Sequence, residues 1–429
     1  MLNRLREHPF LTALLLGLAA QILFLINLGH PAKLMFDEVH YVPAARVLLT
    51  LDHAVNQEHP LLAKEIIAAG IALFGDNPIG WRLFSAIAGA ATVSGVFAIL
   101  WQLCRDWRAG VLGAVLAIVN QMIFVQARIG MLDGFLGMFV VLAIAAMLWA
   151  MRGPARSVPG RLIVTAVLLG LGVAVKWTAV PYVAFAGMTL LFVRMRDARV
   201  AGRPLTTALG DAGQRHWAGI GVVPALLILG LVSITVYFAT FLPAFFYAHD
   251  ALTLRKLIPY QFDMWALQTQ VLPAHPYQSD WWGWPIIARP IWYFYEPDMG
   301  VWRGVLLIGN PVVMWGGLIG VAACLIGWWR TRSGEALGAA GLWIGSLAIW
   351  AIIPKSLGFY YYYYLSSIFL CVALPVSCRL YARGRWRHAG WWYALAAIAM
   401  FAYFYPIIAA MPLTGQQSFT HWTWFVAWR

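Results

Sequence analysis

The chain has 429 residues, of which 62% are hydrophobic and only 11% are charged, and its mean hydropathy is +0.73. This composition excludes an ordinary water-soluble domain, in which about a quarter of the residues are charged. The formal net charge of +13 could indicate nucleic-acid binding, so the positions of the charges decide between the remaining classes.

Apolar stretches of about 17–25 residues, long enough to cross a membrane, recur along the whole chain. They predict an all-α integral membrane protein of about eleven transmembrane helices. The short fifth and sixth stretches are expected to form a hairpin that reaches the outer surface near Lys176. The predicted spans are 10–28, 80–103, 109–126, 134–151, 162–175, 177–193, 217–240, 304–329, 336–353, 358–378 and 390–410.

The basic residues alternate with these spans. If the N-terminus is cytoplasmic, the inner segments hold 18 of the 30 basic residues and only five of the 17 acidic ones, which accounts for the whole net charge of +13. This is the positive-inside pattern that orients membrane helices. It predicts a multi-pass protein of the plasma (inner) membrane, with an external C-terminus after Met411, and it makes nucleic-acid binding unnecessary.

Two outer segments are too long to be simple connectors. The first, 29–79, belongs to a predicted N-terminal transmembrane catalytic half at 1–240, and the second is the outer loop at 241–303. A C-terminal transmembrane bundle is predicted at 304–429. Interfacial helices are expected in both segments, which are the first and fourth outer loops.

The acidic pair Asp37-Glu38 lies in the first outer segment. Partial burial at a membrane surface can raise the pKa of a carboxyl group toward neutrality, as a general base requires. Asp37 is therefore the candidate base, accepting a proton from an acceptor hydroxyl as that oxygen attacks an anomeric carbon. The simpler interpretation is that Asp37 and Glu38 only cap an interfacial helix.

Cations at the outer ends of predicted spans could hold the phosphate of a lipid carrier. Each of them could also extend to the headgroups without any ligand. Asp133 could orient Arg128 or contact substrate, and a structural ion pair between Asp133 and Arg128 is an equally simple explanation. The cations are Lys64, Arg82, Arg128, Lys176, Arg289 and Lys355.

Aromatic residues are concentrated in the second outer segment and after Lys355. Those of 281–285 and 292–295 could stack on sugars, although an aromatic belt at the membrane boundary explains most of them. The five consecutive tyrosines at 360–364 must point in all directions around a helix, so some should face the cavity. His59 and His275 have no histidine partner at a ligand spacing, so no metal site is predicted.

An ordered set of motifs resembles the protein O-mannosyltransferases, which belong to the GT-C class of glycosyltransferases that use polyprenyl-phosphate sugars. Phe36 to Tyr41 is similar to the Asp-Glu motif of the family, and His59 to Lys64 is similar to its His-Pro-Pro-Leu-Gly/Ala-Lys motif. Further similar stretches are Trp81-Arg82-Leu83, Ala127-Arg128 to Asp133, Val175 to Thr178, His275 to Ser279, Trp284-Pro285, Arg289-Pro290 and Ile308 to Val313.

The resemblance implies a sugar, expected to be mannose, carried on a polyprenyl phosphate and transferred with inversion to Ser or Thr hydroxyls of proteins. It implies Asp37 as base, Glu38, His275 and Tyr277 at the acceptor, and Arg128, Lys176 and Lys355 at the donor phosphate. The residues expected to shape the cavity are His59, Lys64, Arg82, Asp133 and Arg289. No cofactor or divalent metal is expected; the expected partners are membrane lipid, the lipid-linked sugar and a polypeptide.

The chain departs from the family pattern at Leu61, where the second proline of the motif is absent, and at Lys355, which is often arginine. It also lacks a large soluble insert in an outer loop, as expected of a bacterial form. Two other functions stay open. A related GT-C enzyme could glycosylate a glycolipid or lipid A, and a transporter would share the many helices, although no internal repeat is found.

Overall fold

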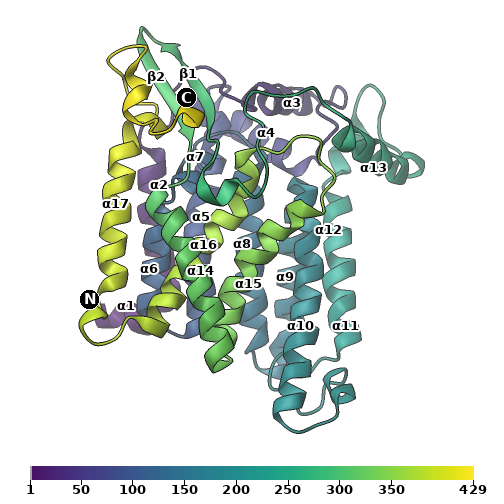
Figure 1. The fold of residues 1–429 in the computed structure, drawn as a ribbon. Coiled ribbons are helices and arrows are strands. Elements are labelled where there is room, and N and C mark those ends of the chain that lie inside the picture. Colours follow the sequence, from purple (N-terminus) through teal and green to yellow (C-terminus); the bar gives the residue numbers. More distant parts are fainter. Residues whose placement is uncertain (1) are drawn as a thin grey trace.

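The computed structural model describes residues 2–429, with side chains from residue 5 onward. Long helices run side by side in one bundle, and shorter elements gather at one end of it (Figure 1). The bundle elements are α1 (Leu2–Glu7), α2 (Pro9–Leu25), α5 (Pro78–Cys104), α6 (Trp107–Ile118), α7 (Gln121–Gln126), α8 (Leu132–Met151), α9 (Val158–Val175), α10 (Val180–Val200), α11 (Val222–Leu227), α12 (Ser233–Ala239), α14 (Pro311–Thr331), α15 (Gly334–Ala348), α16 (Tyr364–Tyr381) and α17 (Ala389–Ile408).

Within residues 2–429, nine helices are long and apolar enough to cross a membrane. They match nine of the predicted spans. The other two predicted spans correspond to shorter apolar helices, Pro9–Leu25 and Trp107–Ile118. The membrane character and the helical fold are thus confirmed, whereas the number of eleven crossings stays a prediction.

The predicted span 109–126 is interrupted, because α6 ends at Ile118 and α7 begins at Gln121. Asn120 lies in this break, and its side chain accepts a hydrogen bond from the Met122 backbone N–H. Asn310 supports the same region, because its amide donates to the Val119 carbonyl at 3.0 Å while its oxygen caps α14. Because the residues on both sides of the break are mostly apolar, hydropathy alone did not predict it.

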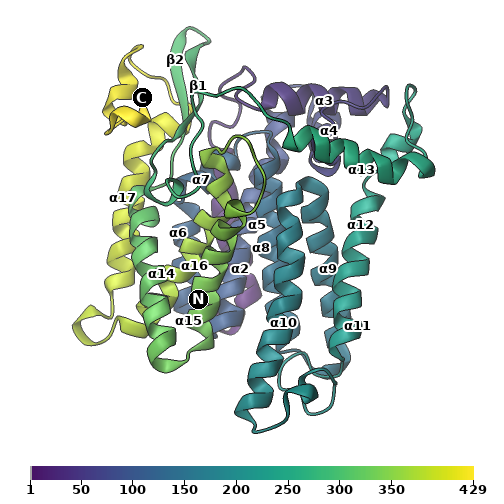
Figure 2. The same ribbon diagram turned by 45° about the vertical axis from the view of Figure 1, so that its right-hand side comes forward.

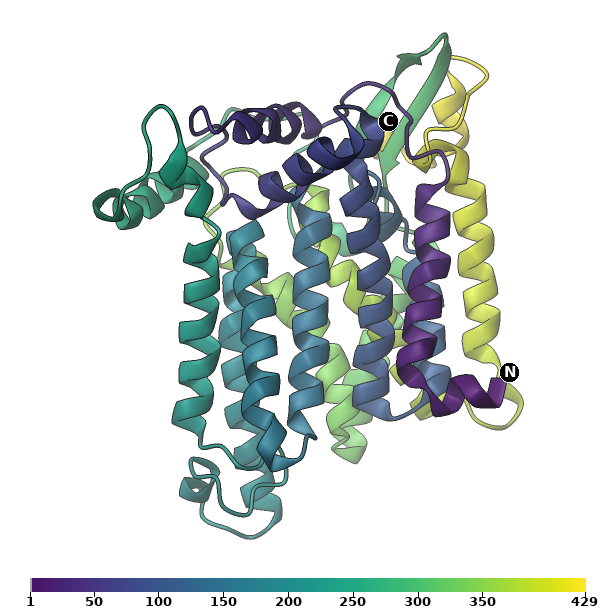
Figure 3. The same cartoon turned by 180° about the vertical axis from the view of Figure 1, so that it is seen from behind.

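The outer segments form α3 (Glu38–Thr50), α4 (Leu62–Phe74) and α13 (Leu254–Thr269), which lie across the axes of the long helices at one end of the bundle (Figures 1 and 3). Figure 2 shows α13 extending sideways from the end of α12. Helices were predicted in both outer loops, and their location at a membrane interface stays a prediction. The C-terminus lies at this same end (Figure 1).

The predicted start of a helix at residue 304 is wrong. Residues 291–307 instead form an antiparallel hairpin, with β1 (Ile291–Asp298) paired to β2 (Val301–Leu307), and α14 starts only at Pro311. The aromatic residues of β1 favour a strand. The turn residues Met299 and Gly300 both have positive φ, as a two-residue hairpin turn requires. The fold is therefore helical except for this hairpin.

Candidate active site

Asp37 occupies the position just before the first residue of α3, which lies at the same end of the bundle as α4 and the hairpin (Figure 1). In the described chain its carboxylate makes no capping hydrogen bond to the first turn of α3. The interpretation of Asp37 as a helix cap is therefore not supported by the geometry. Its half-buried carboxylate is left available for another partner.

Burial raises the pKa of Asp37 to about 6. The charges of His40 and Lys176 act in the opposite direction, and the neighbouring Asp133 raises the pKa further. A carboxyl group with this pKa is mostly ionised at neutral pH and is still basic enough to accept a proton, which is the property predicted for a general base.

Glu38 lies beside Asp37 in sequence but has a different environment. Its side chain is 0% exposed and forms a two-point ion pair with Arg82, with both N···O distances 2.8 Å. The backbone N–H groups of Met35 and Gly130 donate to the same carboxylate. The predicted contact of Glu38 with an acceptor is therefore corrected, because both of its oxygens are already engaged inside the protein.

Arg82 also donates to the carbonyls of Leu28, Pro31 and Lys33. The Glu38–Arg82 pair thus fixes the segment that leads into Asp37. The guanidinium of Arg82 thus contacts the backbone of the first outer segment, and its cavity-shaping role stays a prediction.

Lys176 follows the end of α9 and pairs with Asp133 at the start of α8, with Nζ 2.9 Å from Oδ1. The predicted pair of Asp133 with Arg128 is wrong. The ammonium group of Lys176 also lies 5.2 Å and 5.0 Å from the ring centres of Tyr361 and Tyr362. Lys176 is therefore held beside Asp37 by one carboxylate and two aromatic faces.

Arg128 has different partners from those expected of a phosphate-binding group. Its guanidinium donates to the carbonyls of Phe24, Ile26 and Asn27 at the end of α2. These carbonyls lie in the last turn of α2 and just after it, where helical carbonyls lose their intrahelical donors, so Arg128 caps this end of the helix. The geometry assigns it to the end of α2, and its predicted role at the donor phosphate loses support.

Lys355 lies in the turn after α15 and donates to the Gln268 carbonyl at 2.9 Å. Burial lowers the pKa of Lys355 to about 8, and the charge of Lys176 lowers it further. The carboxylate of Glu58 acts in the opposite direction. Lys355 is thus a second cation whose charge is felt at the same site as that of Lys176.

Lys64 is buried and donates to the carbonyls of Asn56 and His59, at 2.6 Å and 2.9 Å. It therefore fixes the turn between α3 and α4. Burial lowers the pKa of His59 well below its usual value, and the charges of Lys176, Lys355 and Lys64 add to this effect. His59 is thus close to the cations without carrying a charge itself.

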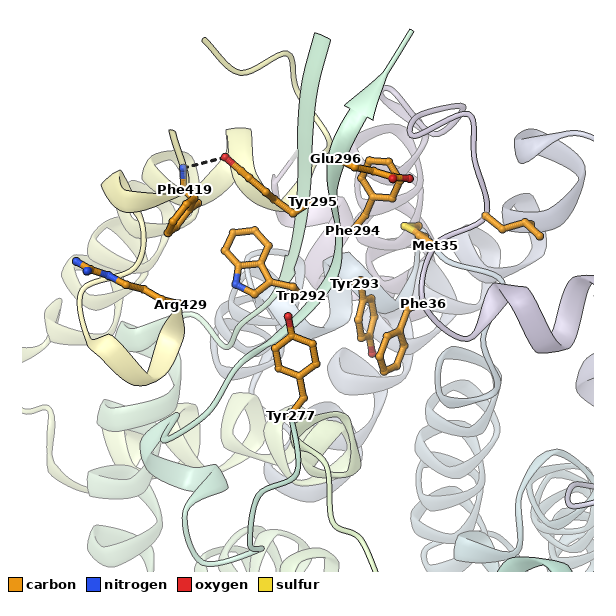
Figure 4. A pocket seen from close by; sticks show the side chains of 11 residues that line it. Met35, Phe36, Tyr277, Trp292, Tyr293, Phe294, Tyr295, Glu296, Phe419 and Arg429 are labelled. Carbon is orange, nitrogen blue, oxygen red and sulfur yellow. Dashed lines mark hydrogen bonds between the residues drawn. The ribbon is translucent and has the colours of Figure 1, made fainter. Parts of the chain in front are cut away.

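A cavity of about 520 Å³ lies beside β1, and its lining includes Phe36, the residue before Asp37 (Figure 4). Phe36 stacks on Tyr293 with ring centres 4.3 Å apart. Tyr277 also lines this cavity, and the ring of His275 lies 5.8 Å from that of Tyr277. Burial raises the pKa of Tyr277, and the nearby charge of Arg289 opposes that rise. Of these residues of the second outer segment, Tyr277 lines the cavity, whereas His275 and Arg289 are neighbours of Tyr277 and not lining residues.

In the part of the chain with described side chains, no three His, Cys, Asp or Glu residues are grouped as metal ligands would be. The absence of a metal requirement stays a prediction.

The sequence pattern included Tyr293 among the aromatic residues that could stack on sugars, but it did not predict that Tyr293 lies against Phe36, nor which of the five tyrosines approach Lys176. Tyr293 points from β1 toward Phe36, and its hydroxyl accepts a hydrogen bond from Gln126 at 3.1 Å. The aromatic run in the outer loop was a signal for this cluster. The sequence does not predict that Tyr293 lies at an irregularity of β1, without a partner residue in β2, where its side chain is buried.

Solved structures share this architecture. The protein O-mannosyltransferase Pmt1-Pmt2 complex of S. cerevisiae, bound to the sugar donor, has a TM-score of 0.81 at 14% identity, covering 97% of this chain and 93% of that chain. ArnT from Cupriavidus metallidurans bound to undecaprenyl phosphate has a TM-score of 0.57 at 16% identity, covering 90% and 63%. The fold is that of the GT-C class of membrane glycosyltransferases.

The sequence narrows this class to one family. The family model for dolichyl-phosphate-mannose-protein mannosyltransferase matches residues 74–249, and the model for the C-terminal four TMM region of protein-O-mannosyltransferase matches 253–428. The chain belongs to the protein O-mannosyltransferase family.

Two bacterial relatives align over nearly the whole chain. The polyprenol-phosphate-mannose--protein mannosyltransferase of Mycolicibacterium smegmatis is 29% identical, covering 98% of this chain and 92% of the relative. The protein of the same name from Mycobacterium tuberculosis is 28% identical, covering 100% and 93%. The resemblance inferred from the motifs is confirmed.

Proposed function

We propose that this protein transfers mannose from a polyprenyl-phosphate carrier to Ser or Thr hydroxyls of proteins. The observation that carries the proposal is the carboxylate of Asp37, which does not cap α3, has a pKa of about 6 and interacts with the charge of Lys176. Lys355 adds a second positive charge that interacts with Lys176. Family membership and the names of the relatives support the same reaction.

In the proposed reaction, the acceptor hydroxyl loses its proton to Asp37 as its oxygen attacks the anomeric carbon. The bond from that carbon to the carrier phosphate breaks on the opposite face, so the configuration inverts. Negative charge grows on the leaving phosphate, and Lys176 and Lys355 stabilise that charge. The protein therefore supplies a base on one side of the sugar and cations on the other.

We further propose that the site lies on the extracytoplasmic face of the plasma (inner) membrane. The loop at 201–221 lies at the end of the bundle opposite α3, α4 and the hairpin (Figure 1). This loop and its flanks carry Arg194, Arg196, Arg199, Arg203 and Arg215. The positive-inside rule makes this basic end cytoplasmic.

The function is tested by incubating the purified protein in proteoliposomes with polyprenyl-phosphate-[³H]mannose and a Ser/Thr-containing peptide. We expect label in the peptide. Because the donor is itself a labelled lipid, the lipids are separated by chromatography. Label in a lipid other than the donor would support the glycolipid-modifying alternative, which the names of the relatives make less favourable. A transporter would leave all the label in the donor.

The rate of transfer is expected to depend on pH as a bell-shaped curve. Asp37 must be deprotonated to accept a proton, so the rate falls about tenfold per pH unit below about 6. Lys355 must be protonated to hold phosphate, so the rate also falls above about pH 8. Lys355→Arg keeps the charge at high pH and should remove only the alkaline fall. An alkaline fall that persists in this variant would exclude Lys355 as its cause.

Donor affinity should separate Lys176 from Arg128. Replacing Lys176 by Met, together with Asp133→Asn to avoid leaving a buried charge, removes a charge-assisted contact worth roughly 1.5–3 kcal/mol. We expect the Kd for polyprenyl-phosphate-mannose to rise about 10- to 100-fold. Arg128→Met should lower thermal stability and leave this Kd nearly unchanged, because Arg128 binds the end of α2. If Arg128→Met raised the Kd and the Lys176 variant did not, Arg128 and not Lys176 would be assigned to the phosphate site.

A further inference from the structure

The strand β1 has an unused edge close to Asp37. The sheet contains two strands, and β1 is paired with β2 along one side only. No third strand pairs with β1 anywhere in residues 2–429. A strand edge of this kind presents a row of backbone N–H and C=O groups that can pair with another extended chain.

The cavity described above lies along this strand, and five consecutive residues of β1, Trp292 to Glu296, line it (Figure 4). On one side it reaches Phe36, and on the other side it reaches Phe419 and Arg429 of the C-terminal segment. Its volume of about 520 Å³ has room for a few side chains but is open to the outer face. The cavity is thus a trough beside the strand β1, whose second edge has no partner strand in residues 2–429.

The lining of the trough includes Phe36, the residue that directly precedes the proposed base Asp37. Tyr293 of β1 stacks on Phe36, with ring centres 4.3 Å apart. Burial raises the pKa of Tyr293, and the charges of Asp133 and Asp37 raise it further. A chain lying along β1 would therefore have one of its residues close to Asp37.

The hairpin is held in a fixed position relative to Asp37. The buried carboxylate of Asp298 at the end of β1 accepts from the Ala32 backbone N–H at 3.1 Å and pairs with Arg303 at 3.3 Å. On the surface, Lys33 donates to the Pro297 carbonyl at 3.0 Å and pairs with Glu296. The segment that Arg82 fixes for Asp37 is thus the same segment that holds β1.

We propose that the acceptor polypeptide binds in an extended conformation along the free edge of β1, as an added strand that presents its Ser or Thr hydroxyl to Asp37. This inference rests on the proposed function. Main-chain hydrogen bonds would then supply much of the affinity, and Trp292, Tyr277 and Phe419 would contact flanking side chains. An enzyme that binds its acceptor in this way can modify many different sequences, because backbone groups are common to all of them.

The proposal predicts a pattern with a period of two. In a strand, successive N–H groups point to opposite sides, so only every second N–H of the acceptor can face β1. The test uses a series of acceptor peptides in which one amide at a time, at each position flanking the reactive Thr, is replaced by an ester. The replacement removes a single donor and keeps the side chain.

We expect KM to rise about 2- to 10-fold for esters at alternate positions, with kcat nearly constant, and to change little at the positions between them. Each ester at an intervening position is the matched control for its neighbours. An equal effect at consecutive positions, or no effect at any, would overturn the proposal while leaving the transferase activity intact. If no peptide is mannosylated, the proposed function fails, and the acceptor proposal fails with it.

Discussion

Asp37→Asn is expected to abolish mannose transfer while keeping most of the affinity for the lipid-linked donor. The amide is nearly the same size as the carboxyl group but cannot accept the proton of the acceptor hydroxyl. Loss of a general base costs roughly 10²- to 10⁴-fold in rate. Lys176 and Lys355, which are proposed to bind the phosphate, stay in place. The measurement pairs single-turnover transfer with a separate Kd for polyprenyl-phosphate-mannose.

Asp52→Asn is the matched control for this variant. Asp52 belongs to the same outer segment, but its side chain is exposed and contacts His53 and His249. We expect the Asp52→Asn variant to transfer mannose at the rate of the unmodified protein. If Asp37→Asn loses donor binding and keeps the rate of the bound complex, the assignment of Asp37 as the base is wrong.

The largest effect on stability is expected from Glu38→Ala. This change leaves the guanidinium of Arg82 without its carboxylate at a site where both side chains are 0% exposed. Removing one partner of such a buried pair costs roughly 3–5 kcal/mol. The variant should unfold at a clearly lower temperature in detergent, with lower yield in membranes. Transfer should also fall, because the segment before Asp37 loses its anchor.

The exposed pair Arg46–Asp76 provides the comparison. Its N···O distance is also 2.8 Å, but both side chains are more than two-fifths exposed. Arg46→Ala should therefore change the free energy of unfolding by no more than about 1 kcal/mol. If Glu38→Ala and Arg46→Ala lowered the free energy of unfolding equally, burial would not be the reason that the Glu38–Arg82 pair stabilises the protein.

The sequence alone determined the membrane class, most of the long helices and the two outer segments that contain the candidate site. These features follow from local composition, because a run of apolar residues is apolar in any fold. The ordered motifs around Asp37, Lys64 and Lys176 also identified the family. The sequence further placed Asp37 in a segment where partial burial was plausible.

Only the tertiary structure decided which charged groups meet. Asp133 pairs with Lys176, 43 residues away, and not with Arg128, while Glu38 pairs with Arg82, 44 residues away. Such pairings depend on how helices pack together, and hydropathy carries no information about packing. The same reason explains the hairpin at 291–307, since its strand edge and its contact with Phe36 arise from elements distant in the chain. The sequence shows which residues are charged or aromatic, whereas only the folded chain determines which of them come into contact.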